Sequence, residues 1–227
     1  KALNHVSFQI NEGTKVAIIG KSGSGKSTAL SLIERFYDPE EGEVTVGGLS
    51  VSEYDLVDYR NHIAYVPQHH KVFSGTLREA LLYGNKQDIP DEILLENAKE
   101  TGFDQYIRLR KEGLDANVAC EAMSGGQLQK LIITREKLRA SKMILLDEPA
   151  SALDAESTRL VQELVTEKFA DQTVVMVTHD LSFIHSMDQI IMFDEGEIIA
   201  SGTYEELLKT SKPFCDFLAS REGRATA

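Results

Sequence analysis

The sequence is poor in cysteine, has no long apolar run and carries no excess of basic residues. Its longest apolar runs, such as VAII (16–19) and MILL (143–146), are far too short to cross a bilayer. The two cysteines, Cys120 and Cys215, lie far apart and form no CxxC or Cys/His cluster, which predicts free thiols in a reducing cytosol. The net charge of −12 argues against a passive nucleic-acid binder, because phosphate contacts require clustered lysine and arginine.

What remains is an ordinary globular composition. The 227 residues suffice for one large domain or two small lobes with a buried core. Apolar residues make up 42% of the chain and charged residues 26%, as in typical soluble domains, and we find no signal peptide, internal repeat or low-complexity block. Because the chain begins at Lys1 rather than at a methionine, we expect it to be part of a longer protein.

Apolar periodicity and turn residues predict strands that alternate with helices. The predicted strands are 15–20, 41–48, 62–68, 143–148 and 173–179, followed by a hairpin over 189–202. The predicted helices are 27–38, 128–140, 155–170 and 180–187. The pairs expected to cap helix starts are Ser52 with Asp55, Thr76 with Glu79, and Thr203 with Glu206. Pro90 is expected in the first turn of a helix that stops near Gly102.

This order of elements predicts an α/β fold with a mainly parallel sheet and helices on both faces. A helical block over 76–140 interrupts the alternation, and we interpret it as an inserted lobe. The expected organisation is a core lobe formed by 1–75 and 141–220, the helical lobe 76–140, and a flexible tail, 221–227.

The stretch GKSGSGKST (20–28) follows a predicted buried strand and opens a predicted helix. Dense glycine and serine are typical of flexible linkers, but the pattern G-x-x-x-x-G-K-[ST] in this context predicts a phosphate-binding turn. Its glycines allow backbone N–H groups to point inward, and the helix N-terminus adds partial positive charge. We expect Lys26 to reach the β- and γ-phosphates and Ser27 to complete a Mg²⁺ shell. A chance match occurs in about one chain in a hundred.

The stretch MILLDE (143–148) supplies two acids at the end of a predicted buried strand. Ligands of open α/β sheets bind at the carboxyl ends of strands, so Asp147 is a candidate for holding Mg²⁺ through its waters. Glu148 is a candidate general base that polarises the attacking water. The alternative is a strand that ends in two solvated acids, and the upstream phosphate motif favours the functional interpretation.

The stretch MSGGQLQK (123–130) resembles a second phosphate turn at a helix start, with Ser124, Gly125 and Gly126. It has no lysine of its own and no preceding strand, so a simple serine-capped helix is the alternative. Two phosphate turns, of which only one is complete, suggest a site shared between two copies of the chain.

These motifs together resemble the nucleotide-binding domain of an ATP-binding cassette (ABC) transporter. GKSGSGKST resembles the Walker A motif, MILLDE the Walker B motif with its catalytic glutamate, and MSGGQ the signature motif. SALD (151–154) resembles the D-loop, Gln68 in YVPQ the Q-loop, and His179 in VTHD the switch histidine. The six motifs stand in family order over nearly the whole chain. The stretch 60–84, with VFSGT after Gln68, resembles exporter-type cassettes in particular.

The resemblance implies a P-loop NTPase (RecA-like) core with a parallel sheet, a small antiparallel β part and an inserted α-helical subdomain. It implies ATP and Mg²⁺ as cofactors, and a head-to-tail pair of copies around two ATP molecules. The implied catalytic residues are Glu148, His179, Gln68 and Lys26, and the implied metal-binding residues are Ser27, Gln68 and Asp147. The residues implied to hold the nucleotide are Gly20, Ser22, Gly23, Ser24, Gly25, Lys26, Ser27, Thr28, Ser124, Gly125, Gly126, Gln127 and Asp154.

The implied partners are a transmembrane domain, fused N-terminally or on a separate chain, and a second nucleotide-binding domain. A homodimer is the simpler expectation, and no nucleic acid is expected. The implied location is the cytoplasmic face of a membrane. An ABC-type ATPase of DNA repair or translation is the alternative, although such proteins usually carry coiled-coil arms or tandem cassettes. A module that binds nucleotide without hydrolysis is a second alternative, against which Glu148 and His179 argue.

The chain departs from the family pattern at four places. The aromatic residue that stacks on adenine would precede Lys1. The segment before the signature, 112–123, is about two residues shorter than the exporter pattern and lacks its TEVGE run. Asp180 follows His179 where many exporters have arginine, and Met123 replaces leucine, which conserves volume.

Overall fold

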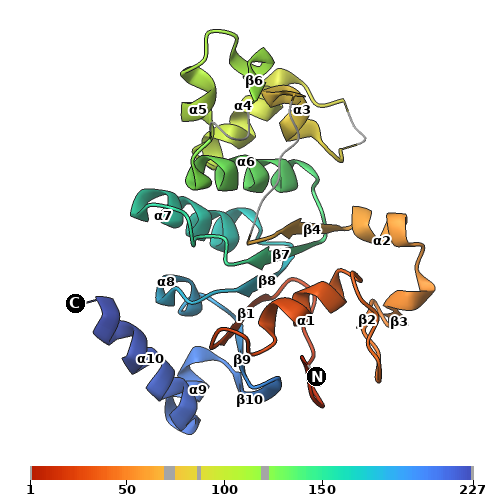
Figure 1. Ribbon diagram of the computed structural model, residues 1–227, viewed down its shortest axis with the longest axis vertical. Coiled ribbons are helices and arrows are strands. Elements are labelled where there is room, and N and C mark those ends of the chain that lie inside the picture. The colour runs from red at the N-terminus through yellow and green to blue at the C-terminus, as the bar shows by residue number, and fades with distance from the viewer. Residues whose placement is uncertain (1, 69–74, 86–87, 119–122, 226–227) are drawn as a thin grey trace.

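A six-stranded sheet forms the centre of the protein (Figure 1), whose computed structural model describes residues 2–68, 75–85, 88–118 and 123–225. In spatial order its strands are β10 (Glu197–Gly202), β9 (Gln189–Asp194), β1 (Lys15–Gly20), β8 (Thr173–Val177), β7 (Met143–Asp147) and β4 (Ile63–Val66). All neighbours are parallel except β9 and β10, which form the predicted antiparallel hairpin. The predicted parallel α/β fold is thus confirmed.

The middles of the central strands are apolar because both faces of the sheet are buried. Along β1, Val16 and Ile18 join one core cluster, whereas Ala17 and Ile19 join the other. The first cluster also contains residues of α1 (Lys26–Ile33), and the second contains residues of α6 (Gly125–Leu138). The helices that follow the two predicted phosphate turns therefore cover opposite faces of one sheet.

The predicted helix over 27–38 is too long. In the structure α1 ends at Ile33, because Arg35 adopts a left-handed conformation with φ of 55° and breaks the helical path. Phe36 consequently lies half exposed, against the ring of Tyr65 with a centroid separation of 5.7 Å, instead of in the core.

The predicted capping by Ser52 is also wrong. Asp55 caps α2 (Leu56–Asn61), where its Oδ1 accepts hydrogen bonds from the backbone N–H groups of Val57 at 3.0 Å and Asp58 at 2.9 Å. Upstream, Ser50 caps a short 3₁₀ turn, Val51–Glu53. Both caps use local side-chain acceptors, and aspartate occupies the position directly before the helix.

The predicted strand 41–48 is a small hairpin in the structure. Its strands β2 (Thr45–Val46) and β3 (Leu49–Ser50) pair antiparallel. Gly47 and Gly48 form the two-residue turn, with φ of 61° and 84°, which glycine adopts without steric cost.

The predicted helical block contains α3 (Leu77–Leu82), α4 (Asp91–Glu100), α5 (Asp104–Arg108) and α6, which gather at one end of the molecule (Figure 1). The capping box of Thr76 with Glu79 is confirmed. Pro90 is the cap before α4 rather than part of its first turn, and the helix ends as predicted just before Gly102. The predicted helix start at 128 is three residues late, because Ser124 caps α6.

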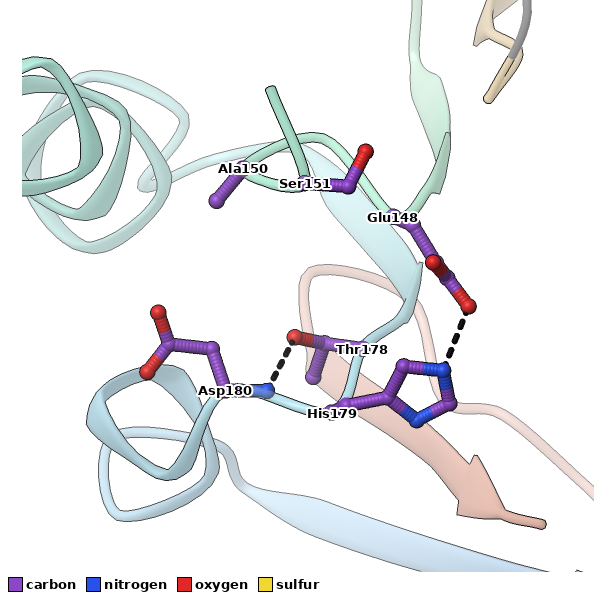
Figure 2. Close-up of a pocket in the computed structure, with 6 residues that line it drawn as sticks. All are labelled: Glu148, Ala150, Ser151, Thr178, His179 and Asp180. Atoms are coloured by element: carbon purple, nitrogen blue, oxygen red, sulfur yellow. Dashed lines mark hydrogen bonds and ion pairs between the residues drawn. The ribbon is translucent and has the colours of Figure 1, made fainter. Parts of the chain in front are cut away.

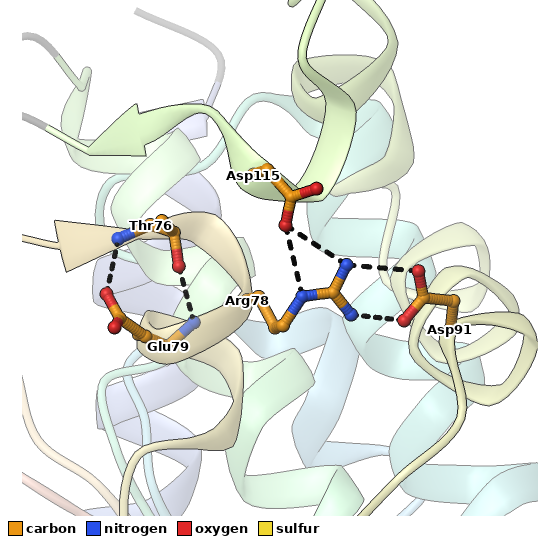
Figure 3. Close-up of polar contacts among 5 residues, drawn as sticks. All are labelled: Thr76, Arg78, Glu79, Asp91 and Asp115. Atoms are coloured by element: carbon orange, nitrogen blue, oxygen red, sulfur yellow. Dashed lines mark hydrogen bonds and ion pairs between the residues drawn. The ribbon is translucent and has the colours of Figure 1, made fainter.

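A short pair of strands within this block was not expected from local sequence. Strand β5 (Gly75–Thr76) pairs antiparallel with β6 (Asn117–Val118), which follows a 3₁₀ turn, Gly113–Asp115. Arg78 of α3 links the 3₁₀ turn to α4, since its guanidinium donates to Asp115 at 3.2 Å and to Asp91 at 3.0 Å (Figure 3).

The remaining helices are α7 (Ala155–Glu163), a π-helical turn η4 (Leu164–Lys168), α8 (Leu181–Ile184), α9 (Tyr204–Thr210) and α10 (Lys212–Ala225). The capping box of Thr203 with Glu206 is confirmed. The predicted helix over 180–187 is shorter than expected, and α10 continues as a helix into the predicted tail, up to Ala225. Cys215 is a free, half-buried thiol, and Cys120 lies outside the described residues.

We predict that Leu131→Ala lowers the free energy of unfolding by about 2–5 kcal/mol, because the fully buried side chain of α6 leaves a cavity. Urea denaturation measures the change. Leu109→Ala is the matched control, since Leu109 is 78% exposed and its loss should cost less than about 0.5 kcal/mol. Equal losses in the two variants would contradict the packing described for α6.

Candidate active site

The first predicted phosphate turn leaves the carboxyl end of β1 and enters α1. Gly20 has φ of 143°, and a Cβ there would lie 2.2 Å from the carbonyl oxygen of Phe193. Gly25 has φ of 102°, and a Cβ there would lie 2.5 Å from the side chain of Leu3. Both positions therefore require glycine for steric as well as conformational reasons.

Two polar side chains of this turn are buried. The hydroxyl of Ser24 is buried with no hydrogen-bond partner among the described residues. It is therefore available to donate a hydrogen bond to a phosphate oxygen. The Lys26 ammonium donates to the carbonyl oxygen of Lys21 at 2.6 Å, so it curls back over the turn. Burial lowers the pKa of Lys26 below its ordinary value, and the charges of Glu148 and Asp147 oppose that shift.

The carboxyl end of β7 meets the start of α1. Ser27 Oγ donates to Asp147 Oδ1 at 3.2 Å, and burial raises the pKa of that carboxyl above its ordinary range. A hydroxyl and a carboxylate at this separation are oxygen ligands suited to Mg²⁺. Among the described residues no cluster of three or more His, Cys, Asp or Glu side chains could hold a metal. The ligands of a cation here would therefore be one carboxylate, neutral oxygen atoms and the oxygens of a bound phosphate.

Two distant motifs converge on the carboxylate of Glu148. His179 Nε2 lies 2.6 Å from Glu148 Oε1 (Figure 2), and Gln68 Nε2 donates to Glu148 Oε2 at 2.8 Å. Glu148 itself has a left-handed backbone with φ of 51°. Burial lowers the pKa of His179, although the neighbouring carboxylate of Glu148 raises it. The lowered pKa favours the neutral imidazole.

A pocket of about 240 Å³ opens beside this carboxylate and is lined by Glu148, Ala150, Ser151, Thr178, His179 and Asp180 (Figure 2). The sequence analysis missed Thr178, which is buried and accepts a hydrogen bond from the backbone N–H of Asp180 at 3.1 Å. This local turn holds His179 between two fixed neighbours. A Ser/Thr followed two residues later by a helix-capping aspartate was the available sequence signal.

The second predicted phosphate turn lies at the start of α6. The Ser124 hydroxyl accepts from the backbone N–H of Gln127 at 3.3 Å, and the Gln127 side chain accepts from the N–H of Ser124 at 3.0 Å. The neighbouring D-loop segment is close, since a Cβ on Gly126 would lie 3.0 Å from the carbonyl oxygen of Ala152. Asp154 caps α7 within its own chain by accepting from the N–H of Ser157 at 2.8 Å.

The structure therefore brings one set of predicted residues together and leaves the other apart. Within the described part of the chain, Lys26 bonds Lys21 inside the turn, and Ser27 bonds Asp147 at the end of β7. Gln68 and His179 both bond Glu148. None of the hydrogen bonds and ion pairs in this described part connects 20–28 with 124–127, although Ser124 and Gly125 are exposed.

The family model described as ABC transporter matches residues 3–151. The chain belongs to the ABC transporter family. A bacterial Atm1-family ABC exporter with ATP bound has the same fold, with a TM-score of 0.92 and 28% identity over 97% of this chain and 39% of that one. The P-loop NTPase fold expected of this family, with small antiparallel sheets and inserted helices, is therefore confirmed.

The relatives include ABC-B family transporters and lipid A-core flippases. ABC transporter B family member 17 of Arabidopsis thaliana is 40% identical over 89% of this chain and 17% of its own length. The ATP-dependent lipid A-core flippase of Mannheimia succiniciproducens is 40% identical over 91% of this chain and 36% of its own length. The chain thus corresponds to the ATPase domain shared by ABC transporters and spans 17% and 36% of the lengths of these two relatives. No helix among the described residues is long and apolar enough to span a membrane.

We predict that Ser24→Ala weakens Mg-ATP binding by about ten- to a hundredfold, because a buried hydroxyl that bonds a charged group contributes roughly 1.5–3 kcal/mol. Without nucleotide the variant should be as stable as the wild type, since the hydroxyl has no partner to lose. Equilibrium titration and thermal unfolding measure the two effects. Ser31→Ala is the control, because that hydroxyl already bonds the carbonyl oxygen of Ser27. An unchanged dissociation constant for Ser24→Ala would refute the assignment.

Proposed function

We propose that the chain binds Mg-ATP at the edge formed by the ends of β1, β7 and β8 and hydrolyses it to power export through a transmembrane partner. The observation that carries the proposal is the convergence of Gln68, Glu148 and His179 beside the phosphate turn. These side chains come from three segments, and each is suited to contact phosphate, cation or water.

The Mg²⁺ ion, when bound, would neutralise phosphate charge and orient the phosphate oxygens. Ser27 and Asp147 would hold it, with Gln68 as a further oxygen ligand. Lys26 would turn from the carbonyl of Lys21 toward the phosphates, where its ammonium finds stronger acceptors. Backbone N–H groups of the turn and the start of α1 would supply the remaining donors.

Glu148 would act as the general base that accepts a proton from the attacking water. His179, held neutral by burial, would donate one ring N–H to the carboxylate or to the γ-phosphate and so keep the two in line. Thr178 keeps the histidine backbone in place through its bond to Asp180. The pocket lined by these residues gives water access to the carboxylate.

The signature turn of a second copy would complete the site. Ser124 and Gly125 are exposed, and they lie on a helix that covers the face of the sheet opposite α1. A head-to-tail pair would place the Ser124 turn of each copy over the phosphate turn of the other, with Asp154 near the contact. We propose a homodimer, because the chain carries both halves of the site.

The relatives support our proposals of a transmembrane partner and a cytoplasmic location. Their matched segments fill between 16% and 36% of their lengths, which leaves room for transmembrane segments in the same chain. We propose that this domain works on the cytoplasmic face, attached to such segments. No observation on the structure favours DNA repair or translation as the setting.

We predict that Glu148→Gln retains ATP binding but lowers hydrolysis at least about a hundredfold, because the amide accepts no proton. The ATP-bound dimer should persist longer, since the step that separates the copies is blocked. Phosphate release and sedimentation measure the two effects. Glu163→Gln, an exposed acid paired with Arg159, is the control. Hydrolysis at the wild-type rate in Glu148→Gln would remove this residue from the proposed chemistry.

We predict that two inactive variants restore activity when they are mixed. Lys26→Ala loses nucleotide binding in its own turn, and Ser124→Arg blocks the turn that it offers to its partner. A mixed head-to-tail pair of full-length proteins contains one site with both defects and one site with neither. ATPase activity should therefore appear on mixing and approach about a quarter of the wild-type value. A double variant that carries both changes is the control, and a mixture that stays inactive would exclude the shared site.

A further inference from the structure

The two helices that begin at the phosphate turns end in one buried charge cluster. Helix α1 begins after Gly25 and has Glu34 as its C-cap, and α6 begins after Ser124 and has Arg139 as its C-cap. The helices cover opposite faces of the sheet, but β4 is an edge strand, so their ends can meet around it.

A chain of hydrogen bonds joins these helix ends through α2. Arg139 Nη2 donates to the carbonyl oxygen of Arg60 at 2.8 Å. Arg60 in turn donates from Nη2 to the carbonyl oxygen of Arg35 at 2.9 Å, and from Nε to that of Glu34 at 3.3 Å. The last turn of the signature helix is therefore tied to the last turn of the helix that follows the phosphate loop.

Two carboxylates lie within this cluster in different situations. Glu136 is 5% exposed and forms ion pairs with Arg135 at 3.0 Å and Arg139 at 2.9 Å. Glu34 is equally buried, but its Oε2 has no hydrogen-bond partner among the described residues. Burial raises the pKa of Glu34 to about 7, while Arg60 and Arg139 lower it and Glu136 raises it.

Charged or titratable groups of the neighbouring elements α2, β4 and α6 and of the end of α1 lie around Glu34. These groups are Tyr59 and Arg60 on α2, Tyr65 on β4, Glu136 and Arg139 on α6, and Arg35 beside it. Burial is the main cause that raises the pKa of both tyrosines, so they stay neutral below about pH 10. Glu34 is thus the member of the cluster that changes charge near neutral pH.

We propose that Glu34 is a positioning residue whose charge sets how firmly the end of α6 is held against the end of α1. The ionised carboxylate attracts the guanidinium groups of Arg60 and Arg139 and draws the helix ends together. The neutral carboxyl exerts no such attraction, which leaves Arg139 with its ion pair to Glu136 and its bond to the carbonyl oxygen of Arg60. This inference rests on the proposed function, because the opposite ends of the two helices are the proposed halves of the ATP site.

Protonation of Glu34 also increases the free energy of unfolding. Its pKa is higher in the folded protein than the ordinary value of 4.5, so the folded state binds the proton more tightly. The resulting stabilisation is fully present below about pH 4.5 and is lost as the pH rises through about 7. Removal of the titrating group should therefore flatten the fall in stability over this interval.

The test compares ATP hydrolysis by the full-length wild type and Glu34→Gln between about pH 6 and about pH 8.5. We expect the wild-type kcat to rise on the order of threefold across pH 7 relative to the variant, with an unchanged KM for Mg-ATP. The matched control is Glu100→Gln. Glu100 also pairs with α6, through Lys137 at 2.8 Å, but its pKa is lowered, so it stays ionised throughout.

A second variant gives a directional result. Arg139→Gln removes one of the two cations that lower the pKa of Glu34, so the inflection in kcat should move to higher pH. If Glu34→Gln does not fold, this shift decides the question. An active Glu34→Gln that keeps the wild-type inflection, or an Arg139→Gln inflection that does not move, overturns the proposal.

Thermal unfolding separates this inference from the proposed function. The fall in Tm between about pH 5 and about pH 7.5 should be shallower in nucleotide-free Glu34→Gln than in the wild type. If the wild type hydrolyses no ATP, the proposed function fails, and the unfolding series still shows whether Glu34 titrates. Equal slopes in the two proteins would contradict the role of Glu34 even if ATP hydrolysis is intact.

Discussion

The parallel register of β1, β8 and β7 is the constraint on which the rest of the structure depends. Ile18 pairs with Val177, and Val177 pairs with Asp147, so the three strands finish at nearly the same level. The ladder extends one residue further, because Thr178 N donates to the carbonyl oxygen of Ile18 and Glu148 N donates to that of Val177. The backbone thereby fixes the phosphate turn, Glu148 and the residue before the switch histidine relative to one another.

Burial of both sheet faces explains why a single chain presents its two phosphate turns separately. Alternate residues of β1 enter different core clusters, one closed by α1 and the other by α6. Each helix is held by its own apolar contacts, so the start of each is directed by a different face. The complete binding site that we propose is therefore a property of a pair of chains, whereas the strand-end chemistry belongs to one.

Features with local causes could be predicted from the sequence. The central strands follow from apolar runs, and the capping boxes at Thr76 and Thr203 follow from side chains three residues apart. The early end of α1 could not be predicted, because Phe36 has the right helical spacing but packs on Tyr65 instead. The pairing of β5 with β6 joins segments about forty residues apart, which local patterns do not report. At the site, sequence motifs indicated the individual residues, but not that Gln68 and His179 bond the same carboxylate.

Glu148 is bonded by both Gln68 and His179, and these contacts affect the binding of a ligand. Any phosphate or cation that takes over Gln68 and His179 must first displace two contacts to a carboxylate. The affinity for such a ligand is reduced by the free energy needed to break the contacts of Gln68 and His179 with Glu148. The same exchange of contacts releases the carboxylate toward water only once its two neighbours have found new partners. In the mechanism that we propose, ligand binding at Gln68 and His179 would therefore free the carboxylate of Glu148.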